Sequence, residues 1–305
     1  MSPKTIIILT GPTASGKTDL AASLASHFQS DIISADSRQC FRELNIGVAK
    51  PDTGLLERIP HHFINSHSVE DTVNAAVFES MATRWCESIL DQHEVVIVCG
   101  GTGLYIKAFL EGLDEIPAVE EAVRRDILAQ YKEEGLGWLQ EKLRQEDPQF
   151  YACGEIENPQ RLMRALEVVQ STGRSIISYR HQQKKQLPYR ILEFAMLVPR
   201  PLLYRRINER VEGMMDAGLL AEVQSLLRFR HLNALQTVGY TELFEYLDGM
   251  RSLNDSIARI QQNTRHYAKR QMTWFNKIEN LQWIGEDHFE TILRAYHSLK
   301  TYNRL

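Results

Sequence analysis

The sequence predicts an α/β fold in which a parallel sheet is flanked by helices, with an all-helical insertion domain in the middle of the chain. Three observations support this prediction. Short apolar runs alternate with helical patterns, a glycine-rich loop follows the first run, and a stretch after Pro117 contains helical patterns only. Alternating strands and helices are typical of a parallel sheet that is covered on both faces.

The glycine-rich loop lies between a strand predicted at residues 5–10 and a helix predicted at residues 16–28. It reads Gly11-Pro12-Thr13-Ala14-Ser15-Gly16-Lys17-Thr18, which is the spacing of a P-loop. The glycines let backbone amides curl around a phosphate, and the helix directs its positive dipole end at the anion. Lys17 adds a positive charge, and the Thr18 hydroxyl can bind Mg²⁺. The core is therefore predicted to be P-loop NTPase-like and to bind a polyphosphate with Mg²⁺ as its cofactor.

The rest of the core alternates in the same way. Strands are predicted at residues 31–35, 95–98 and 189–198, and helices at residues 72–91, 104–110, 201–215 and 253–278. The β-branched run at 95–98 is typical of a buried parallel strand. The helix at 72–91 is expected to bury its apolar residues at a spacing of four, namely Val73, Val77, Met81 and Trp85. Residues 44–68 are rich in Gly and Pro and are predicted to be loop.

The insertion is predicted from helical patterns at 119–133, 137–146 and 159–170 and from a short helix after Gly173. The third pattern begins at Pro159 behind Asn158, a favourable N-cap. We expect residues 1–117 and 186–305 to form the core with its C-terminal helices, and 118–185 to form the insertion. Between Pro159 and Arg190, seven positive residues accompany one negative residue, which gives a local charge of +6. Such a cluster indicates either contact with a polyanion or a solvated face.

Composition narrows the class of protein. The chain has 305 residues and 43% hydrophobic residues, which supports a packed core, and its net charge of −4 argues against a generic nucleic-acid binder. The four cysteines form no C-x-x-C pair, so we expect ordinary thiols in a reducing compartment. No stretch approaches eighteen apolar residues. The expectation is a cytoplasmic protein without a membrane span.

The acidic residues do not occupy the positions that the usual P-loop NTPases require. The strand at 95–98 ends in Cys99 rather than in an aspartate that would help to hold Mg²⁺, and no Asn-Lys-x-Asp run for guanine follows a strand. A small-molecule kinase survives these objections better than a GTPase. Asp36 follows the second strand, where open parallel sheets bind their ligands. It is a candidate general base or outer-shell metal partner, and the alternative is an Asx-turn cap.

The helix predicted at 253–278 has one face on which apolar and aromatic residues recur at steps of three and four. We expect this face to be buried. It also carries Thr264 and Gln271, which need hydrogen-bond partners there. Thr264 is expected to bond nearby backbone, whereas Gln271 is open to either a structural role or a place at a site.

Several motifs together resemble one family. They occur in order along nearly the whole chain and read Asp36-Ser37-Arg38-Gln39, Asn45-Ile46-Gly47-Val48-Ala49-Lys50-Pro51, Pro60-His61-His62-Phe63-Ile64, Gly100-Gly101-Thr102-Gly103-Leu104-Tyr105, Asn158-Pro159-Gln160-Arg161-Leu162-Met163-Arg164-Ala165-Leu166-Glu167, Val238-Gly239-Tyr240 and Lys269-Arg270-Gln271-Met272-Thr273-Trp274. Each alone is weak, but seven in this order resemble the tRNA dimethylallyltransferases, also called tRNA isopentenyltransferases.

The resemblance implies a prenyltransferase that moves a dimethylallyl group from dimethylallyl diphosphate to the N6 amine of adenosine 37 in tRNA, beside the anticodon, and releases pyrophosphate. Asp36 is then the general base. Lys17, Thr18 with Mg²⁺ and the loop amides stabilise the leaving diphosphate. Arg206 and Arg210 lie one helical turn apart and either close over the pyrophosphate or form a solvated face. A nucleotide-binding or ATP-binding label would follow from the P-loop pattern, but we expect the loop to hold the prenyl diphosphate.

The resemblance also implies contacts with the tRNA anticodon stem-loop, held by core and insertion of a monomer. The residues implied are Asp36, Ser37, Arg38, Gln39, Thr102, Arg124, Gln160, Arg161, Leu162, Met163 and Arg164. The chain departs from the family pattern at Gln236 and Thr241, which leaves contacts from that segment undecided. His61 and His62 match the family and are expected to be structural.

Three other functions share parts of this pattern. A nucleotide kinase would use the P-loop but leaves the basic insertion unexplained. A prenyltransferase that acts on free AMP-like nucleotides has no need of a tRNA-binding insertion. A non-catalytic RNA-binding protein with a vestigial P-loop conflicts with the intact Lys17, Thr18 and Asp36.

Overall fold

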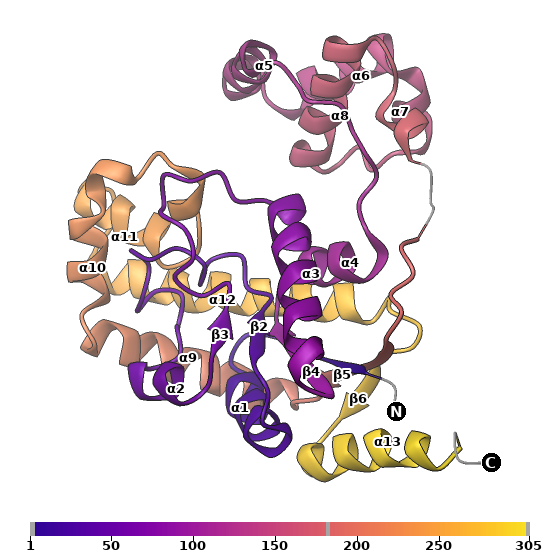
Figure 1. Ribbon diagram of the computed structural model, residues 1–305. Coiled ribbons are helices and arrows are strands. Elements are labelled where there is room, and N and C mark those ends of the chain that lie inside the picture. The colour runs from indigo at the N-terminus through magenta and orange to yellow at the C-terminus, as the bar shows by residue number, and fades with distance from the viewer. Residues whose placement is uncertain (1–3, 181–183, 303–305) are drawn as a thin grey trace. The chain divides into compact units, whose positions relative to one another are not determined.

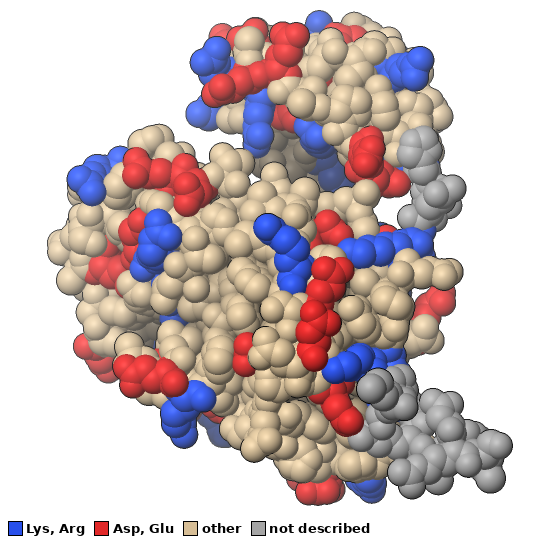
Figure 2. Space-filling model, in the orientation of Figure 1, with Lys and Arg blue, Asp and Glu red and all other residues tan. Residues whose placement is uncertain are grey.

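The computed structural model describes residues 4–180 and 184–302, and the chain forms two compact units (Figure 1). One consists of Met1–Glu111 and Gln186–Leu305, and the other of Gly112–Lys185. The first change of unit therefore follows Glu111, six residues earlier than the boundary expected after residue 117. Charged side chains of both signs are interspersed over the visible surface, in keeping with the small net charge (Figure 2).

The first unit is built on a six-stranded sheet whose neighbouring strands are all parallel. The order is β3-β2-β4-β1-β5-β6, and the strands are β1 (Thr5–Thr10), β2 (Ile32–Ser34), β3 (His61–His62), β4 (Val95–Gly100), β5 (Arg190–Met196) and β6 (Gln282–Ile284). The predicted α/β class is confirmed. The edge strands β3 and β6 were not predicted, because they lack the apolar run that identified the equally short β2.

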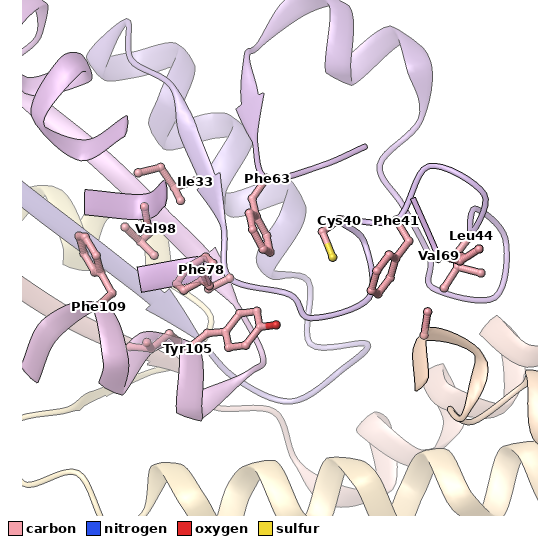
Figure 3. Close-up of a cluster of buried hydrophobic side chains, with 14 of the residues drawn as sticks. Ile33, Cys40, Phe41, Leu44, Phe63, Val69, Phe78, Val98, Tyr105 and Phe109 are labelled. Carbon is pink, nitrogen blue, oxygen red and sulfur yellow. The ribbon is translucent and has the colours of Figure 1, made fainter. Parts of the chain in front are cut away.

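Both faces of the sheet are covered. Ile6 and Ile8 of β1 belong to one buried cluster and Ile7 and Leu9 to another, as expected for a central parallel strand. Figure 3 shows part of the first cluster, where Phe78 stacks on Tyr105 with ring centres 4.6 Å apart. The second cluster receives side chains from the first and the last helix of the chain.

The helices of this unit are α1 (Lys17–Phe28), α2 (Thr53–Arg58), α3 (Ala75–Gln92), α4 (Gly103–Glu111), α9 (Arg200–Asp216), α10 (Leu219–Ser225), α11 (Tyr240–Leu247), α12 (Leu253–Phe275) and α13 (His288–Tyr302). Helix α3 begins three residues later than predicted, because the Asn74 side chain caps it by accepting from the Ala76 and Val77 amides. Its fully buried side chains include Phe78, Ala82 and Cys86, whereas the predicted stripe one residue earlier is half-buried. Helix α2 lies in the segment predicted to be loop.

All regular secondary structure among the described residues of the second unit is helical. It contains α5 (Glu121–Glu134), α6 (Leu136–Glu146), α7 (Pro148–Cys153), α8 (Pro159–Thr172) and a 3₁₀ turn at Ile176–Tyr179. Its own core includes Ile127, Leu139, Phe150 and Leu166. Asn158 caps α8 as predicted, by accepting from the Gln160 and Arg161 amides. Helix α7 was not predicted; Asp147 caps it through the Phe150 amide.

Within the described ranges, no helix combines the length and the apolar character that a membrane span requires.

Candidate active site

A cavity of about 900 Å³ opens in the first unit where β1, β2 and β4 end. Its lining includes the P-loop from Thr13 to Thr18, the turn from Asp36 to Gln39, and Cys99 with the two glycines that follow it. These segments follow three neighbouring strands, so their positions come directly from the strand order. Ligands of open parallel sheets bind at this edge.

The P-loop has the backbone that its glycines predict. Gly16 precedes α1 with φ +90°, and no side chain caps the helix, so its first amides are left to the cavity. Gly11 has φ +144°, and a Cβ there would lie 3.1 Å from Cβ of Met196. The hydroxyl of Ser15 is buried without a hydrogen-bond partner among the described residues. Open amides, a helix N-terminus and an unsatisfied hydroxyl together fit an oxyanion ligand.

Lys17 and Arg210 supply positive charge to this cavity. The Lys17 ammonium donates to the Pro12 carbonyl at 2.7 Å. Burial lowers the pKa of Lys17 to about 8, Cys99 and Asp36 oppose that shift, and Arg210 adds to it. Burial also lowers the pKa of Arg210, which lines the cavity, while Asp19 opposes the shift. Arg206 and Arg210 are both exposed to solvent, but only Arg210 lines the cavity, so of the two arginines only Arg210 is brought to the site.

Asp36 forms the Asx turn that the sequence analysis weighed against a functional role. Its Oδ1 atom accepts from the Arg38 amide at 2.9 Å and from the Gln39 amide at 3.2 Å. The Oδ2 atom has no hydrogen-bond partner within the described part of the chain, and Asp36 lines the cavity. The turn therefore fixes one oxygen and leaves the other available to the cavity, so the Asx turn is compatible with a role for Asp36 toward a ligand.

Thr102 and Gln39 tie this turn to its surroundings. The Thr102 hydroxyl accepts from the Ser37 amide at 3.1 Å. The Gln39 amide group donates to the carbonyls of Val48 and Ala49, at 3.2 and 3.1 Å. Arg38 donates to Asn233 at 3.4 Å. These four residues therefore have partners within the protein, and Gln39 in particular acts as a structural brace.

Gln271, which the sequence left open, bridges two loops of the site. Its Oε1 atom accepts from the Thr13 amide and its Nε2 atom donates to the Gly101 carbonyl, both at 2.9 Å. A Cβ at Gly101 would lie 2.2 Å from Nε2, so a larger residue there would have to displace the Gln271 amide. The Thr264 hydroxyl donates to the Ile260 carbonyl one turn back at 2.7 Å, as predicted. Gln271 thus fixes the P-loop, whereas Thr264 satisfies itself within α12.

The face of α12 that carries these residues is not buried throughout. Ile260 and Gln271 are buried, but the Tyr267 side chain remains 36% exposed and lines the cavity. The prediction of a fully buried stripe is therefore wrong at this position. One part of this face of α12 packs on the apolar core, and another part borders the cavity at the strand ends.

A second wall of the cavity was missed by sequence reasoning. Residues 45–51, which we call the loop wall, are held by the Glu222 carboxylate of α10. It accepts from the amides of Asn45, Ile46 and Gly47 at 2.8–3.1 Å, and from the Tyr240 hydroxyl at 2.6 Å. More than 170 residues separate Glu222 from this loop, so no local pattern could have revealed the contact.

Lys50 holds the loop wall from within. Its ammonium, which has three N–H donors, lies within hydrogen-bond distance of four oxygens, those of the Phe41 and Arg42 carbonyls and of the Asn45 and Asn65 side-chain amides. Burial lowers the pKa of Lys50 to about 8, against the opposing effect of Glu222. The motif that the sequence analysis quoted across Asn45–Pro51 is thus a structural one, built around one carboxylate and one ammonium.

Two of the expected tRNA contacts in the second unit are wrong as side-chain contacts. Leu162 is fully buried and Met163 is 6% exposed, because both lie on the inner face of the amphipathic helix α8. Gln160 and Arg161 are exposed, and Arg161 forms an ion pair with Glu155. Arg164 and Arg124 pair with the buried Glu167 at 3.3 and 3.7 Å. Part of the +6 charge is therefore offset inside this unit.

The remaining motif residues have structural partners. His61 bonds the Ile59 carbonyl and His62 bonds Asp31, each at 2.8 Å, which agrees with the expected structural role. Gln236 and Thr241, where the chain departs from the family pattern, both line the cavity. Gln236 donates to the Arg230 carbonyl at 2.7 Å, and the Thr241 hydroxyl donates to Glu242 at 3.0 Å.

Magnesium fits this site only as a partner of a bound phosphate. The described residues contain no group of three or more His, Cys, Asp or Glu side chains that could hold a metal alone. Thr18 lines the cavity, and its hydroxyl is the protein ligand that a P-loop offers.

Fold and site together define a protein with a P-loop NTPase-like fold whose P-loop and Asp36 carboxylate line one cavity. A family model described as IPP transferase matches residues 39–278 of this chain. The chain belongs to that family.

The similarity to known proteins extends over nearly the whole chain. A protein of Bacteroides thetaiotaomicron named tRNA dimethylallyltransferase 1 is 44% identical over 99% of this chain and 97% of its own length. The tRNA dimethylallyltransferase of Cytophaga hutchinsonii is 41% identical over 92% of each chain. Among solved structures, a tRNA isopentenylpyrophosphate transferase of Bacillus halodurans is 31% identical, with a TM-score of 0.70 over 98% of this chain and 96% of that one. A eukaryotic dimethylallyltransferase acting on tRNA has a TM-score of 0.77 at 25% identity, over 92% and 74%.

Proposed function

We propose that this protein transfers the dimethylallyl group of dimethylallyl diphosphate to the N6 amine of adenosine 37 in tRNA, 3′-adjacent to the anticodon, and releases pyrophosphate. The observation that carries the proposal is that the P-loop, which follows β1, and the Asp36 carboxylate, which follows β2, line one cavity on either side of the end of β4. The names of the relatives support the same reaction.

We assign the two halves of the reaction to two groups of residues in the cavity. Lys17, the P-loop amides and Arg210 bind the diphosphate and stabilise the charge that grows on it as the bond from carbon to oxygen breaks. Asp36 accepts a proton from the N6 amine as the new bond from nitrogen to carbon forms. The amine is a poor nucleophile because its lone pair is delocalised into the adenine ring. A positioned general base contributes about 10²–10⁴-fold in rate.

Mg²⁺ would be held by the Thr18 hydroxyl and by oxygens of the diphosphate. When bound, it neutralises charge on the departing pyrophosphate. Because the protein offers so few ligands of its own, we expect the metal to bind together with the substrate.

We propose that the second unit binds the anticodon stem-loop through the exposed side chains of α8 and α5, including Gln160, Arg161, Arg164 and Arg124. Single-stranded RNA loops are where proteins read sequence, and a target base must leave its stack to enter a pocket. We further propose a monomer that acts in the cytoplasm.

The test is a transfer assay with purified protein, Mg²⁺, radiolabelled dimethylallyl diphosphate and unmodified tRNA that carries adenosine beside the anticodon. AMP and a tRNA with guanosine at that position serve as parallel acceptors. We expect label only in the adenosine tRNA. Label in AMP would assign the protein to the free-nucleotide branch, and no label in any acceptor would reopen the kinase alternative.

A further inference from the structure

The cavity contains one aromatic side chain that the proposed reaction has not used. Among the described residues that line it, Tyr267 of α12 is the only Phe, Tyr or Trp. Several other large aromatic side chains of this unit, such as Phe63, Phe78 and Phe109, are fully buried in its core. Tyr267 is 36% exposed, so its ring meets the cavity rather than packed protein.

Tyr267 is held beside the turn that carries Asp36. Its hydroxyl is a hydrogen-bond partner of the Thr102 side chain, and the Thr102 hydroxyl also accepts from the Ser37 amide. One side chain therefore connects the Tyr267 ring to the residue that follows Asp36. Asp36, Arg38 and Tyr267 all line the cavity, and the charges of Asp36 and Arg38 act on the Tyr267 hydroxyl.

The ring is also fixed and uncharged. The Arg270 guanidinium lies 5.8 Å from the ring centre, within cation–π range. Burial of the hydroxyl raises the pKa of Tyr267 to about 12, so the phenol keeps its proton at neutral pH. A fixed aromatic ring loses little conformational freedom when a second ring stacks on it.

We infer that Tyr267 is the platform on which the extruded purine base of the RNA substrate stacks, so that its exocyclic amine is presented to Asp36. This inference rests on the proposed function. A base that leaves its helical stack loses stacking energy, and an aromatic side chain in the receiving pocket restores part of it. No other aromatic ring of Phe, Tyr or Trp type is offered by the described lining of this cavity.

The inference is tested by comparing Tyr267→Leu, Tyr267→Phe and a control, Gln262→Ala, which alters an exposed residue of the same helix outside the cavity. Steady-state transfer to tRNA is measured for each. We expect Tyr267→Leu to lower kcat/KM for tRNA by about ten- to a hundred-fold, the usual effect of removing one base–aromatic stack. Tyr267→Phe keeps the ring and should stay within about threefold of the unaltered protein, because only the hydrogen bond to Thr102 is lost.

A second readout follows the base itself. An anticodon stem-loop RNA is made with 2-aminopurine at the target position; this fluorescent purine lacks the reacting amine and is quenched when it stacks. Bound to the unaltered protein or to Tyr267→Phe, its fluorescence should be low, and bound to Tyr267→Leu it should rise several-fold. The KM for dimethylallyl diphosphate, measured for every variant, verifies that the P-loop remains intact.

The outcomes separate this inference from the proposed function. If the unaltered protein transfers no label to tRNA, the proposed function fails. If it does transfer label, but Tyr267→Leu matches Gln262→Ala in both kcat/KM and fluorescence, the stacking role is overturned. It is equally overturned if Tyr267→Phe is as impaired as Tyr267→Leu, because the hydroxyl and not the ring would then be required.

Discussion

The two walls of the cavity are built in opposite ways. The strand-end wall, made of the P-loop and the turn at Asp36–Gln39, leaves polar groups open: the first amides of α1, the Ser15 hydroxyl and one oxygen of Asp36. The loop wall at residues 45–51 satisfies its polar groups internally, through Glu222 and Lys50. Buried polar groups without partners cost free energy, so the first wall is suited to receiving a ligand and the second to holding a shape.

This difference predicts that the two walls respond differently to mutation. Changes in the strand-end wall should remove turnover and leave the fold unaffected, because the ligand is the missing partner there. Changes in the loop wall should destabilise the fold, because its partners are already part of the protein.

The largest effect is expected from Asp36→Asn. Asparagine keeps the oxygen that accepts from the Arg38 and Gln39 amides, so the Asx turn should persist, but it cannot accept a proton from the substrate amine. We expect kcat to fall about 10²–10⁴-fold, with tRNA affinity and the free energy of unfolding nearly unchanged. Single-turnover kinetics, filter binding and urea denaturation measure the three quantities. Unchanged turnover would remove Asp36 from the mechanism.

Glu222→Ala should produce the converse result. Three backbone amides and the Tyr240 hydroxyl lose their common acceptor, and we expect the free energy of unfolding to fall by about 2–4 kcal/mol. Glu209→Ala is the control, because its 3.7 Å ion pair with Arg205 is exposed and should contribute less than about 1 kcal/mol. If Glu222→Ala kept its full stability but lost most of its kcat, the predicted difference between the two walls would be wrong.

Gln271→Leu should show an intermediate effect, because Gln271 is the brace of the strand-end wall. Without it, the Thr13 amide and the Gly101 carbonyl lose their partners. We expect the KM for dimethylallyl diphosphate to rise about tenfold while kcat changes less, since one hydrogen bond is worth roughly that factor. Thr264→Val is the matched control on the same helix, because its hydroxyl bonds only the Ile260 carbonyl. Equal effects of the two substitutions would show that Gln271 does not position the P-loop.

The smallest effect concerns pH. The pKa of Lys17 is lowered to about 8, so the free protein loses this charge as the pH rises through 8, and a bound diphosphate must restore it by proton uptake. Affinity for pyrophosphate with Mg²⁺ should therefore be constant below that pH and fall by up to about tenfold per pH unit above it. Calorimetric titrations from pH 7 to 8.5 measure this slope. Lys17→Arg should flatten it, because a guanidinium stays charged; the ionisation of pyrophosphate is common to both proteins. If the unaltered protein and Lys17→Arg gave the same slope, the pH dependence would come from a group other than Lys17.

Sequence patterns predicted the structure best where one short segment of the chain forms a complete structural feature. The P-loop was predicted correctly because strand, glycines and helix start are consecutive in the sequence. The caps at Asn158 and the hydroxyl bond of Thr264 are local in the same sense. Prediction failed where no apolar run is present or where context decides: β3 and β6 lack such a run, and the stripe expected on α3 was displaced by one residue.

The sequence by itself determined the class of fold, the phosphate loop, the acidic residue at the next strand end and the helical character of the insertion, because each depends on residues that are near neighbours in the chain. Only the tertiary structure decided that Glu222 holds the loop wall, that Gln271 braces Thr13, that Arg210 and not Arg206 lines the cavity, and that Tyr267 meets the cavity while Leu162 is buried. These contacts join segments far apart in the chain, or depend on which face of a helix meets solvent. Both are fixed by how the elements pack and not by their own periodicity.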